Sequence, residues 1–310
     1  ANVAAVRSAL NASNRRVVVT SEIEHASLRE LWHVIGHEGC EVRFGRTLSS
    51  GEVDVDHLSE LIDDDVALLC VQAVNNETGV IQPIREVCRR AREWGAMVLV
   101  DAAQAVGKME FSPAVIGADY VSFTGHKFHA PAGVGVLYSR DNWDGFVALV
   151  TGGSQESGVR GGTHNLIGIS ALGEAARVRS AHLSEAISHM RQLRDVFEEI
   201  VLSNVPSSEV NGDAPRVCNT VNIRFGNIDG KALFAQLSDA GVECSQSSAC
   251  TAAYPEPSHV LKAMGLSYHE AFSSIRFSFS IQNTLEEARE AARIVVERAK
   301  MIESVLGGVW

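Results

Sequence analysis

Two short segments near the middle of the chain carry side chains that could do chemistry together. Residues 97–101 (MVLVD) form an apolar run that ends in Asp101, and the later run 122–127 (SFTGHK) ends in Lys127, beside Thr124 and His126. An acid at the end of a buried strand is costly unless a cation faces it. Alone, Asp101 would best be interpreted as a helix N-cap or half of a structural ion pair. The lysine that follows makes a reaction centre the stronger interpretation.

A lysine just beyond a strand, next to a hydroxyl and an imidazole, suits pyridoxal 5'-phosphate (PLP). The amine of Lys127 has to be reachable and able to lose its proton to form a Schiff base. Asp101 would pair with the protonated pyridine nitrogen and keep the ring an electron sink. The hydroxyl, imidazole and backbone N–H groups near Lys127 would cradle the phosphate.

These residues need a buried sheet to position them, and the first half of the chain has the pattern of one. Apolar runs predict strands at 16–20, 41–44, 66–74, 97–101, 120–123 and 133–139, and helices are expected at 26–37, 53–62 and 83–94, the last with Pro83 in its first turn. Continuous apolar strands separated by helices predict a mostly parallel sheet of the α/β class. Ligands of such sheets bind beyond the carboxyl ends of the strands.

The character of the sequence changes after Gly152. A Gly-rich stretch leads into a long helical region at 165–202, and then strands (217–225, 241–244, 274–279) mix with helices (230–240, 258–264, 284–306). This pattern predicts a smaller α+β domain. We therefore expect a large PLP-binding domain over 1–180 and a small C-terminal domain over 181–310.

Composition narrows the class of protein. The chain has 310 residues, is 45% hydrophobic and has a net charge of −11, which argues against direct binding to nucleic acid or to an anionic membrane. No apolar run is long enough to span a bilayer and no leader opens the chain, so we expect a cytoplasmic protein. The six cysteines are scattered without paired spacing, which favours free thiols in a reducing compartment.

Eight short motifs together give the chain a resemblance to the cysteine desulfurases, a branch of the fold-type I PLP enzymes. They follow in family order along the whole chain: 21–25 (SEIEH), 74–79 (VNNETG), 100–104 (VDAAQ), 125–127 (GHK), 160–163 (RGGT), 248–251 (SACT), 256–261 (EPSHVL) and 275–278 (IRFS). GHK alone would be a weak signal, whereas the ordered set is highly specific. The resemblance implies PLP as cofactor, L-cysteine as substrate and a homodimer with composite active sites.

The resemblance also implies a role for each matching residue. Lys127 would bind the cofactor covalently and His25 would stack on its pyridine ring. The remaining cofactor-binding residues would be Asp101 at the ring nitrogen, Asn76 and Gln104 at the ring oxygen and neighbouring atoms, Thr124 and His126 at the phosphate, and Thr163 at the phosphate of the other subunit. Arg276 would grip the substrate carboxylate, with Asn76 beside it. Ordinary alternatives exist for most of them: a surface N-cap for His25, loop amides for Asn76 and Gln104, turn caps for Thr124 and His126, and a surface strand arginine for Arg276.

Cys250 distinguishes a desulfurase from other enzymes of this fold. It lies in a stretch of small and polar residues followed by Pro255 and Pro257, which predicts a loop with an accessible thiol. The resemblance implies that Lys127 removes the α-proton of cysteine and that the Cys250 thiolate attacks the substrate sulfur. Alanine and a persulfide on Cys250 would result, and an acceptor protein would take the sulfur by thiol exchange.

Two departures from the family pattern carry expectations of their own. The Gly-rich phosphate-binding turn that ends in Thr-Glu would come just before Ala1, so we expect a longer natural chain. Ser247 stands where most relatives have Gly, which restricts the backbone. We therefore expect an ordered loop that holds Cys250 away from the cofactor at rest.

Other interpretations stay open. A selenocysteine lyase, another lyase or aminotransferase of the same fold, or a non-catalytic scaffold for sulfur transfer would share much of the pattern. The sulfur could serve iron–sulfur assembly, tRNA thiolation or DNA phosphorothioation, the last because of a faint overall similarity. His33 and His37 have metal-ligand spacing near Cys40, but with no fourth ligand an exposed helix face is the better interpretation, and no metal is expected.

Overall fold

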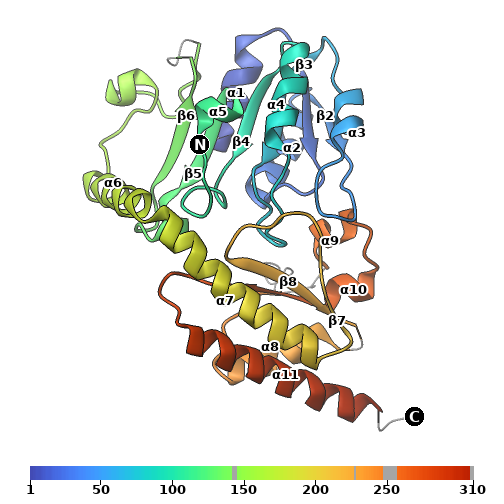
Figure 1. Ribbon diagram of the computed structural model, residues 1–310. Coiled ribbons are helices and arrows are strands. Elements are labelled where there is room, and N and C mark those ends of the chain that lie inside the picture. Colours follow the sequence, from blue (N-terminus) through green and yellow to red (C-terminus); the bar gives the residue numbers. More distant parts are fainter. Residues whose placement is uncertain (142–144, 227, 247–256, 308–310) are drawn as a thin grey trace. The chain divides into compact units, whose positions relative to one another are not determined.

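Six strands form the sheet of the first of two structural units. The computed structural model describes residues 1–141, 145–226, 228–246 and 257–307. Its first unit comprises 1–47, 53–75 and 82–183, and its second 48–52, 76–81 and 184–310 (Figure 1). The second unit thus includes two short segments from the first half of the chain, which no feature of the sequence indicated.

The sheet of the first unit has the order β2-β1-β3-β4-β5-β6. All neighbouring strands are parallel except the pair β5–β6, which confirms the predicted mostly parallel α/β fold. The strands are β1 (Val17–Ser21), β2 (Glu41–Gly45), β3 (Val66–Gln72), β4 (Met97–Asp101), β5 (Tyr120–Thr124) and β6 (Gly135–Ser139). The carboxyl ends of β1, β3, β4 and β5 therefore meet at one edge of the sheet.

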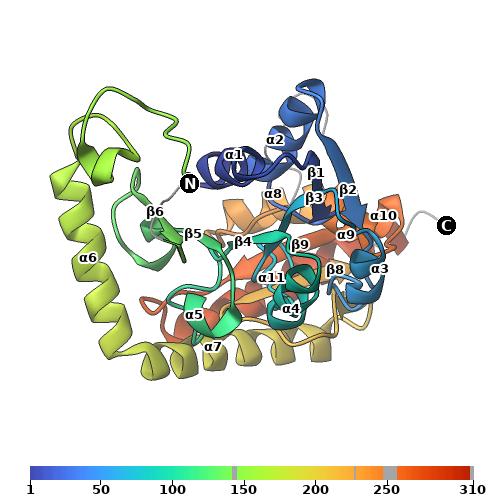
Figure 2. The same cartoon turned by 90° about the horizontal axis from the view of Figure 1, so that it is seen from above.

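Helices cover both faces of this sheet, with α1 and α2 on one side and α4 and α5 on the other (Figure 2). Strand residues Val18, Leu68 and Leu99 are fully buried in a cluster with side chains of α1 and α2. The helical elements of this unit are α1 (Asn2–Ala12), α2 (Ala26–His37), α3 (Val55–Glu60), α4 (Ile84–Glu93), α5 (Pro113–Ile116), α6 (Leu166–Ala181) and the 3₁₀ turns η1 (Gly125–Phe128) and η2 (Gln155–Gly158).

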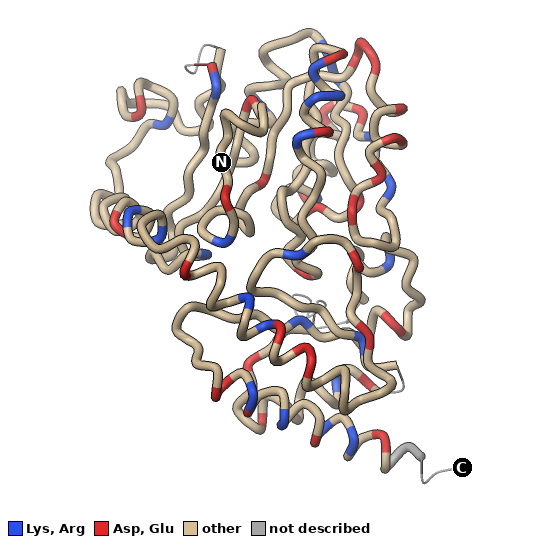
Figure 3. Tube along the Cα trace, in the orientation of Figure 1, with Lys and Arg blue, Asp and Glu red and all other residues tan. Residues whose placement is uncertain are grey.

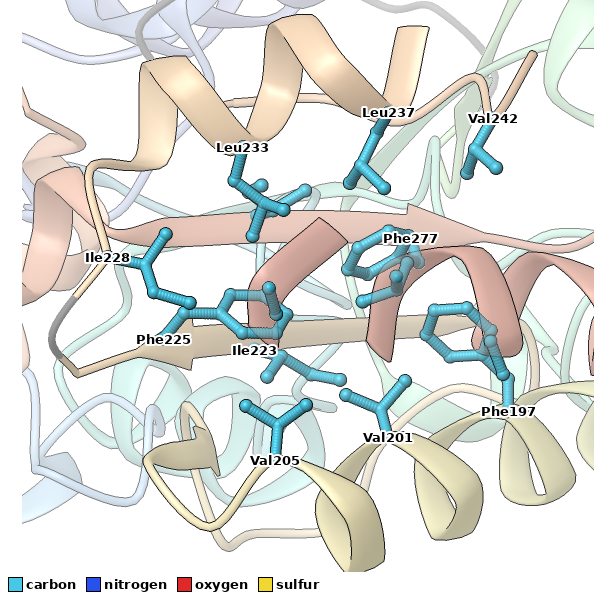
Figure 4. Packing of buried hydrophobic residues seen from close by; sticks show 14 of the residues in the cluster. Phe197, Val201, Val205, Ile223, Phe225, Ile228, Leu233, Leu237, Val242 and Phe277 are labelled. Carbon is cyan, nitrogen blue, oxygen red and sulfur yellow. The ribbon is translucent and has the colours of Figure 1, made fainter. Parts of the chain in front are cut away.

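The second unit is built on a three-stranded antiparallel sheet of the order β7-β8-β9. Phe197, Ile223 and Leu237 come from three different elements and meet in its core (Figure 4). The rings of Phe197 and Phe277 lie 4.7 Å apart between centroids. The elements are β7 (Ser208–Val210), β8 (Thr220–Phe225), β9 (Ser274–Ser278), α7 (Leu183–Asn204), α8 (Gly230–Asp239), α9 (His259–Ala263), α10 (Tyr268–Phe272) and α11 (Leu285–Gly307).

The long helical region predicted over 165–202 is confirmed, and it consists of two helices, α6 and α7, which meet at His182. Two other predictions of local structure are wrong. Residues 241–244 form no strand; the neighbouring Ser245 makes only an isolated bridge to Arg276, while Val242 is buried in the core. Pro83 is the N-cap of α4 and not part of its first turn.

Lys and Arg residues are interspersed with Asp and Glu residues over both units (Figure 3). The five described cysteines are all free thiols. Within the described ranges, no helix is both long and apolar enough to cross a bilayer, and no three His, Cys, Asp or Glu side chains gather as metal ligands would.

Candidate functional site

Asp101 is a buried acid of the first unit, at the carboxyl end of β4. Its side chain is 8% exposed. Oδ1 accepts the backbone N–H of Ala103 at 3.0 Å and Oδ2 accepts the side-chain amide of Asn2 at 3.2 Å. Both hydrogen-bond donors are neutral, while the charge of the Ala1 amino group also interacts with Asp101. The arrangement suits a cationic ligand group, because a buried carboxylate gains most from a charged donor.

A chain of hydrogen bonds connects Asp101 with His25. The amide of Asn2 also donates to the hydroxyl of Ser27 at 3.3 Å, and this hydroxyl lies 3.0 Å from Nδ1 of His25. His25 is the N-cap of α2, and its Nδ1 accepts the backbone N–H of Ser27 at 3.2 Å. These two contacts at Nδ1 orient the exposed His25 ring, whereas its stacking on a cofactor stays a prediction.

Glu24 is a second buried acid of the first unit, and it is completely inaccessible to solvent. Its Oε1 accepts hydrogen bonds from the hydroxyl of Ser21 and, at 3.1 Å, from the backbone N–H of Gln72. Burial, opposed by these hydrogen bonds and reinforced by the charge of Asp101, raises the pKa of Glu24 to about 8. Glu24 is therefore mostly protonated at neutral pH, and it fastens the segment before His25 to the end of β3.

Lys127 lies in the 3₁₀ turn η1, directly after β5, with an exposed side chain. The Thr124 hydroxyl lies 2.9 Å from Nδ1 of His126 and 3.2 Å from the carbonyl oxygen of Val134. Partial burial and then the charges of Lys127 and Lys108 lower the pKa of His126, so its ring is neutral at pH 7. The structure thus brings the two predicted phosphate ligands, Thr124 and His126, into contact beside the lysine.

Gly125 explains how the chain can turn so sharply before the lysine. A Cβ atom at this position would collide with the Leu172 side chain of α6 and would lie 2.7 Å from Cβ of Ala130. Only glycine allows this close approach without a shift of the neighbours. The first residue of the GHK motif is therefore required by packing, whereas the roles of His126 and Lys127 toward the cofactor stay predictions.

Gln104 lies after β4 and is held by Lys108, whose Nζ donates to its Oε1. Thr163 lies in the exposed chain between Gly162 and helix α6. The roles of both residues toward the cofactor stay predictions.

Asn76 and Arg276 both belong to the second unit. Nη1 of Arg276 donates to the carbonyl oxygen of Asn76 at 2.7 Å, so the two residues predicted to bind the substrate are in contact. The backbone of Arg276 also pairs with Ser245 through hydrogen bonds of 2.8 and 3.0 Å. Strand β9 thus fixes Arg276 in place.

Cys250 and Ser247 lie outside the described residues, and so does the expectation of an ordered loop. The described chain on both sides of this segment is anchored in the second unit. Nε2 of Gln246 donates to the carbonyl oxygen of Phe272 at 2.7 Å, and the hydroxyl of Ser258 donates to the carboxylate of Glu77.

The residues of the first unit fit PLP. The buried Asp101 has only neutral donors, as a partner of a protonated pyridine nitrogen should. The Oγ atom of Ser122, which is opposite Asp101 on β5, is buried and makes no hydrogen bond among the described residues. A polar ligand at this sheet edge would also complete its hydrogen bonding.

Four residues that support the site were not predicted from the sequence: Asn2, Ser27, Glu24 and Lys108. Glu24 belongs to the motif at 21–25, but no local feature of the sequence indicated that it is buried. Asn2 and Ser27 become neighbours of Asp101 only when α1 and α2 pack on the sheet. Lys108 follows Gln104 by four residues, but only the turns over 102–109 bring the two side chains together.

Comparisons with known proteins agree on one family. Residues 1–290 match the family described as Aminotransferase class-V. A protein named cysteine desulfurase from Nostoc sp. is 39% identical over 304 residues, which cover 96% of this chain and 76% of the relative. A solved structure named NifS-like protein has a TM-score of 0.87 and 32% identity, with 96% of this chain and 79% of that chain covered. The crystal structure of DndA from Streptomyces lividans has a TM-score of 0.74 and 33% identity, with 90% and 78% covered.

Proposed function

This chain belongs to the cysteine desulfurase family of the class-V aminotransferases, and we propose that it uses PLP to convert L-cysteine to L-alanine, leaving the sulfur as a persulfide on Cys250. The observation that carries the proposal is the placement of the buried Asp101 and of the Lys127 turn after neighbouring strands, β4 and β5, at one edge of the sheet. Asp101, His25, Gln104, Thr124, His126, Lys127 and Asn76 would hold the cofactor, with Thr163 of a partner subunit.

When bound, PLP supplies an electron sink for the negative charge that develops at the α-carbon of the substrate. The remaining steps belong to the side chains. Arg276 binds the carboxylate of cysteine and orients its α-carbon. Nζ of Lys127 removes the α-proton and later returns a proton to the product.

The Cys250 thiolate attacks the sulfur of the substrate, so an S–S bond forms as the C–S bond of cysteine breaks. Alanine leaves with the substrate's carbon skeleton, and no external oxidant is needed because the sulfur is transferred as a neutral atom. An acceptor protein then attacks the persulfide through its own thiolate.

The purified full chain tests this proposal directly. With PLP, L-cysteine and a thiol reductant, it should form alanine and sulfide in equal amounts and show the visible absorbance of bound cofactor. Lys127→Ala should lose the absorbance and the reaction, while Cys250→Ser should keep the absorbance and lose sulfide release. Unchanged turnover of Cys250→Ser would favour an aminotransferase. If the wild-type chain does not bind PLP, a non-catalytic scaffold for sulfur transfer would be favoured instead. Selenocysteine turnover without cysteine turnover would favour a selenocysteine lyase.

We also propose that the protein is a homodimer in which Thr163 completes the site of the partner subunit. Exposed apolar side chains flank Thr163 in the sequence: Leu149, Val150, Leu166, Ile167 and Ile169. Ile167 is 84% exposed. A second copy would remove such a surface from water, since monomers rarely expose apolar residues in this density.

The destination of the sulfur and the cytoplasmic location are further proposals. Transfer goes to a protein and not to nucleic acid, in keeping with the net charge of −11. The likeness to the DndA structure is consistent with DNA phosphorothioation, and iron–sulfur assembly and tRNA thiolation are the other candidate pathways. Incubation of the persulfidated full chain with purified acceptors of each pathway, followed by detection of the labelled sulfur, would distinguish them.

A further inference from the structure

Lys108 is a buried lysine close to the candidate site, with a side chain only 8% exposed. Lysine is rarely buried unless its ammonium group is paired. Here Nζ donates a hydrogen bond to Oε1 of Gln104, the residue expected at the ring oxygen of the cofactor. A buried cation bonded to a residue of the site suggests a task beyond stability.

The turns after β4 place the two residues together. Backbone hydrogen bonds join Val106 to Ala102 at 3.1 Å and Met109 to Ala105 at 3.2 Å, so the chain makes consecutive turns from 102 to 109. The lysine therefore reaches Gln104 from one turn further along.

Close packing fixes this turn against the segment that carries Lys127. Gly107 has a φ of +77°, and a Cβ atom there would lie 2.8 Å from Cβ of Phe128 and 3.2 Å from Cγ of Arg179. Phe128 directly follows Lys127 in η1. The Gln104–Lys108 pair is thus held at a fixed place relative to the turn of the lysine.

The chemistry of the pair decides which end of the Gln104 amide faces the site. An ammonium group only donates hydrogen bonds, so the amide must turn its oxygen toward Lys108. Its NH₂ group then points away from the lysine and stays available as a donor. The ring oxygen of PLP is an acceptor, and a glutamine without such a partner could present either end of its amide.

We propose that Lys108 is a positioning residue: it orients Gln104 so that the amide NH₂ faces the ring oxygen of PLP, and it thereby sets the affinity of the site for the cofactor. The inference rests on the proposed function, because it assumes that PLP binds at this sheet edge. Burial lowers the pKa values of His126 and His129, and the positive charges of Lys127 and Arg179 respectively, followed by that of Lys108, lower them further.

A double-mutant cycle on the full chain tests the inference, with the dissociation constant of PLP from the apoprotein as readout. Lys108→Met keeps the apolar stem and removes the donor, and Gln104→Ala removes the amide. Each should weaken PLP binding about tenfold, the size of one hydrogen bond. If Lys108 acts through Gln104, the double variant should bind within about twofold of either single variant, because neither interaction remains to be lost.

Two more variants keep the inference testable if Lys108→Met folds poorly. Lys108→Arg retains a group that only donates, so PLP binding should stay within about threefold of wild type. Gln104→Glu presents no NH₂ group and should lose about tenfold, like Gln104→Ala. Lys300→Met, an exposed change on α11, is the matched control and should leave the affinity unchanged.

Multiplying effects in the double variant, about a hundredfold in total, would overturn the inference and leave Lys108 a purely structural residue. So would wild-type affinity in Lys108→Met. Failure of the wild-type chain to bind PLP would instead overturn the proposed function, so the two failures are distinguishable.

Discussion

The side-chain amide of Asn2 donates a 3.2 Å hydrogen bond to Oδ2 of Asp101, which ties the first turn of α1 to the carboxyl end of β4. The same amide group reaches the hydroxyl of Ser27 at 3.3 Å, next to the His25 ring. Helix α1 therefore connects the acid and the imidazole that the family resemblance assigns to the two sides of one cofactor ring. The two hydrogen bonds that Asp101 accepts both come from neutral amide groups, which leaves it able to face a cationic partner.

Asp101→Asn should weaken PLP binding by about 10- to 100-fold, because a charge-assisted hydrogen bond to the pyridine nitrogen is lost while the shape is kept. Titration of the apoprotein with PLP measures this. Asp239→Asn, an exposed change on α8, is the control. Equal PLP affinity of Asp101→Asn and wild type would mean that Asp101 has a structural role only.

Glu24→Gln should flatten the pH dependence of stability. The folded-state pKa of Glu24 is raised from 4.5 to about 8, so the folded chain keeps a proton that the unfolded chain releases. Its contribution to stability is complete below pH 4.5 and is lost as the pH rises to about 8, by roughly 5 kcal/mol as an upper limit. A glutamine oxygen can still accept both hydrogen bonds. Unfolding free energies measured from pH 5 to about 9 should therefore diverge in favour of the variant as the pH rises.

The exposed neighbour Glu22 provides the control for this measurement. Glu22→Gln should follow the wild-type profile over the whole pH range. Parallel profiles for Glu24→Gln and wild type would show that Glu24 is ionised in the folded protein at neutral pH.

Gly125→Ala should destabilise the protein by about 1–3 kcal/mol, the usual cost of overpacking. The added methyl group would meet Leu172 and Ala130, so the Lys127 turn has to move. Gly36→Ala is a fitting control, since nothing lies within 4 Å of that position and alanine favours helix α2. Thermal unfolding of both variants should show opposite shifts. A Gly125→Ala protein as stable as wild type would contradict the packing argument.

Ile167→Asp should convert the proposed dimer to monomers, because it places a charge in the exposed apolar surface beside Thr163. Light scattering after size exclusion gives the mass. Val115→Asp, at a 59% exposed position on α5, should leave the assembly unchanged. A wild-type chain that is monomeric at high concentration would refute the dimer and the role of Thr163 across it.

Strong local patterns were sufficient to predict much of the fold. The helix at 26–37 and the strand at 97–101 have the predicted bounds, because each combines an apolar pattern with clear ends. The apolar character of 241–244 was misleading, since Val242 fills the core from an irregular segment. The break between α6 and α7 at His182 has no Gly or Pro to mark it, so periodicity alone could not reveal it.

The site residues that belong to a recognisable sequence motif could be predicted. Their contacts with residues from distant parts of the chain could not. Asp101 and Thr124 end strands β4 and β5, and His126 and Lys127 directly follow β5, so chain order places them at one edge. The bond from Asn2 to Asp101 spans 99 positions and depends on how α1 packs. The Glu24–Gln72 bond depends in the same way on the pairing of β1 with β3.

The most direct measurement is mass spectrometry of the full chain after reaction with L-cysteine and PLP in the absence of reductant. We predict that the peptide with Cys250 gains the mass of one sulfur atom as alanine forms. The Lys127→Ala variant should show neither the mass increase nor alanine. Cys244, whose pKa burial raises to about 12, should stay unmodified because its thiol is protonated. Alanine formation without sulfur on Cys250, or sulfur on another cysteine, would contradict the account.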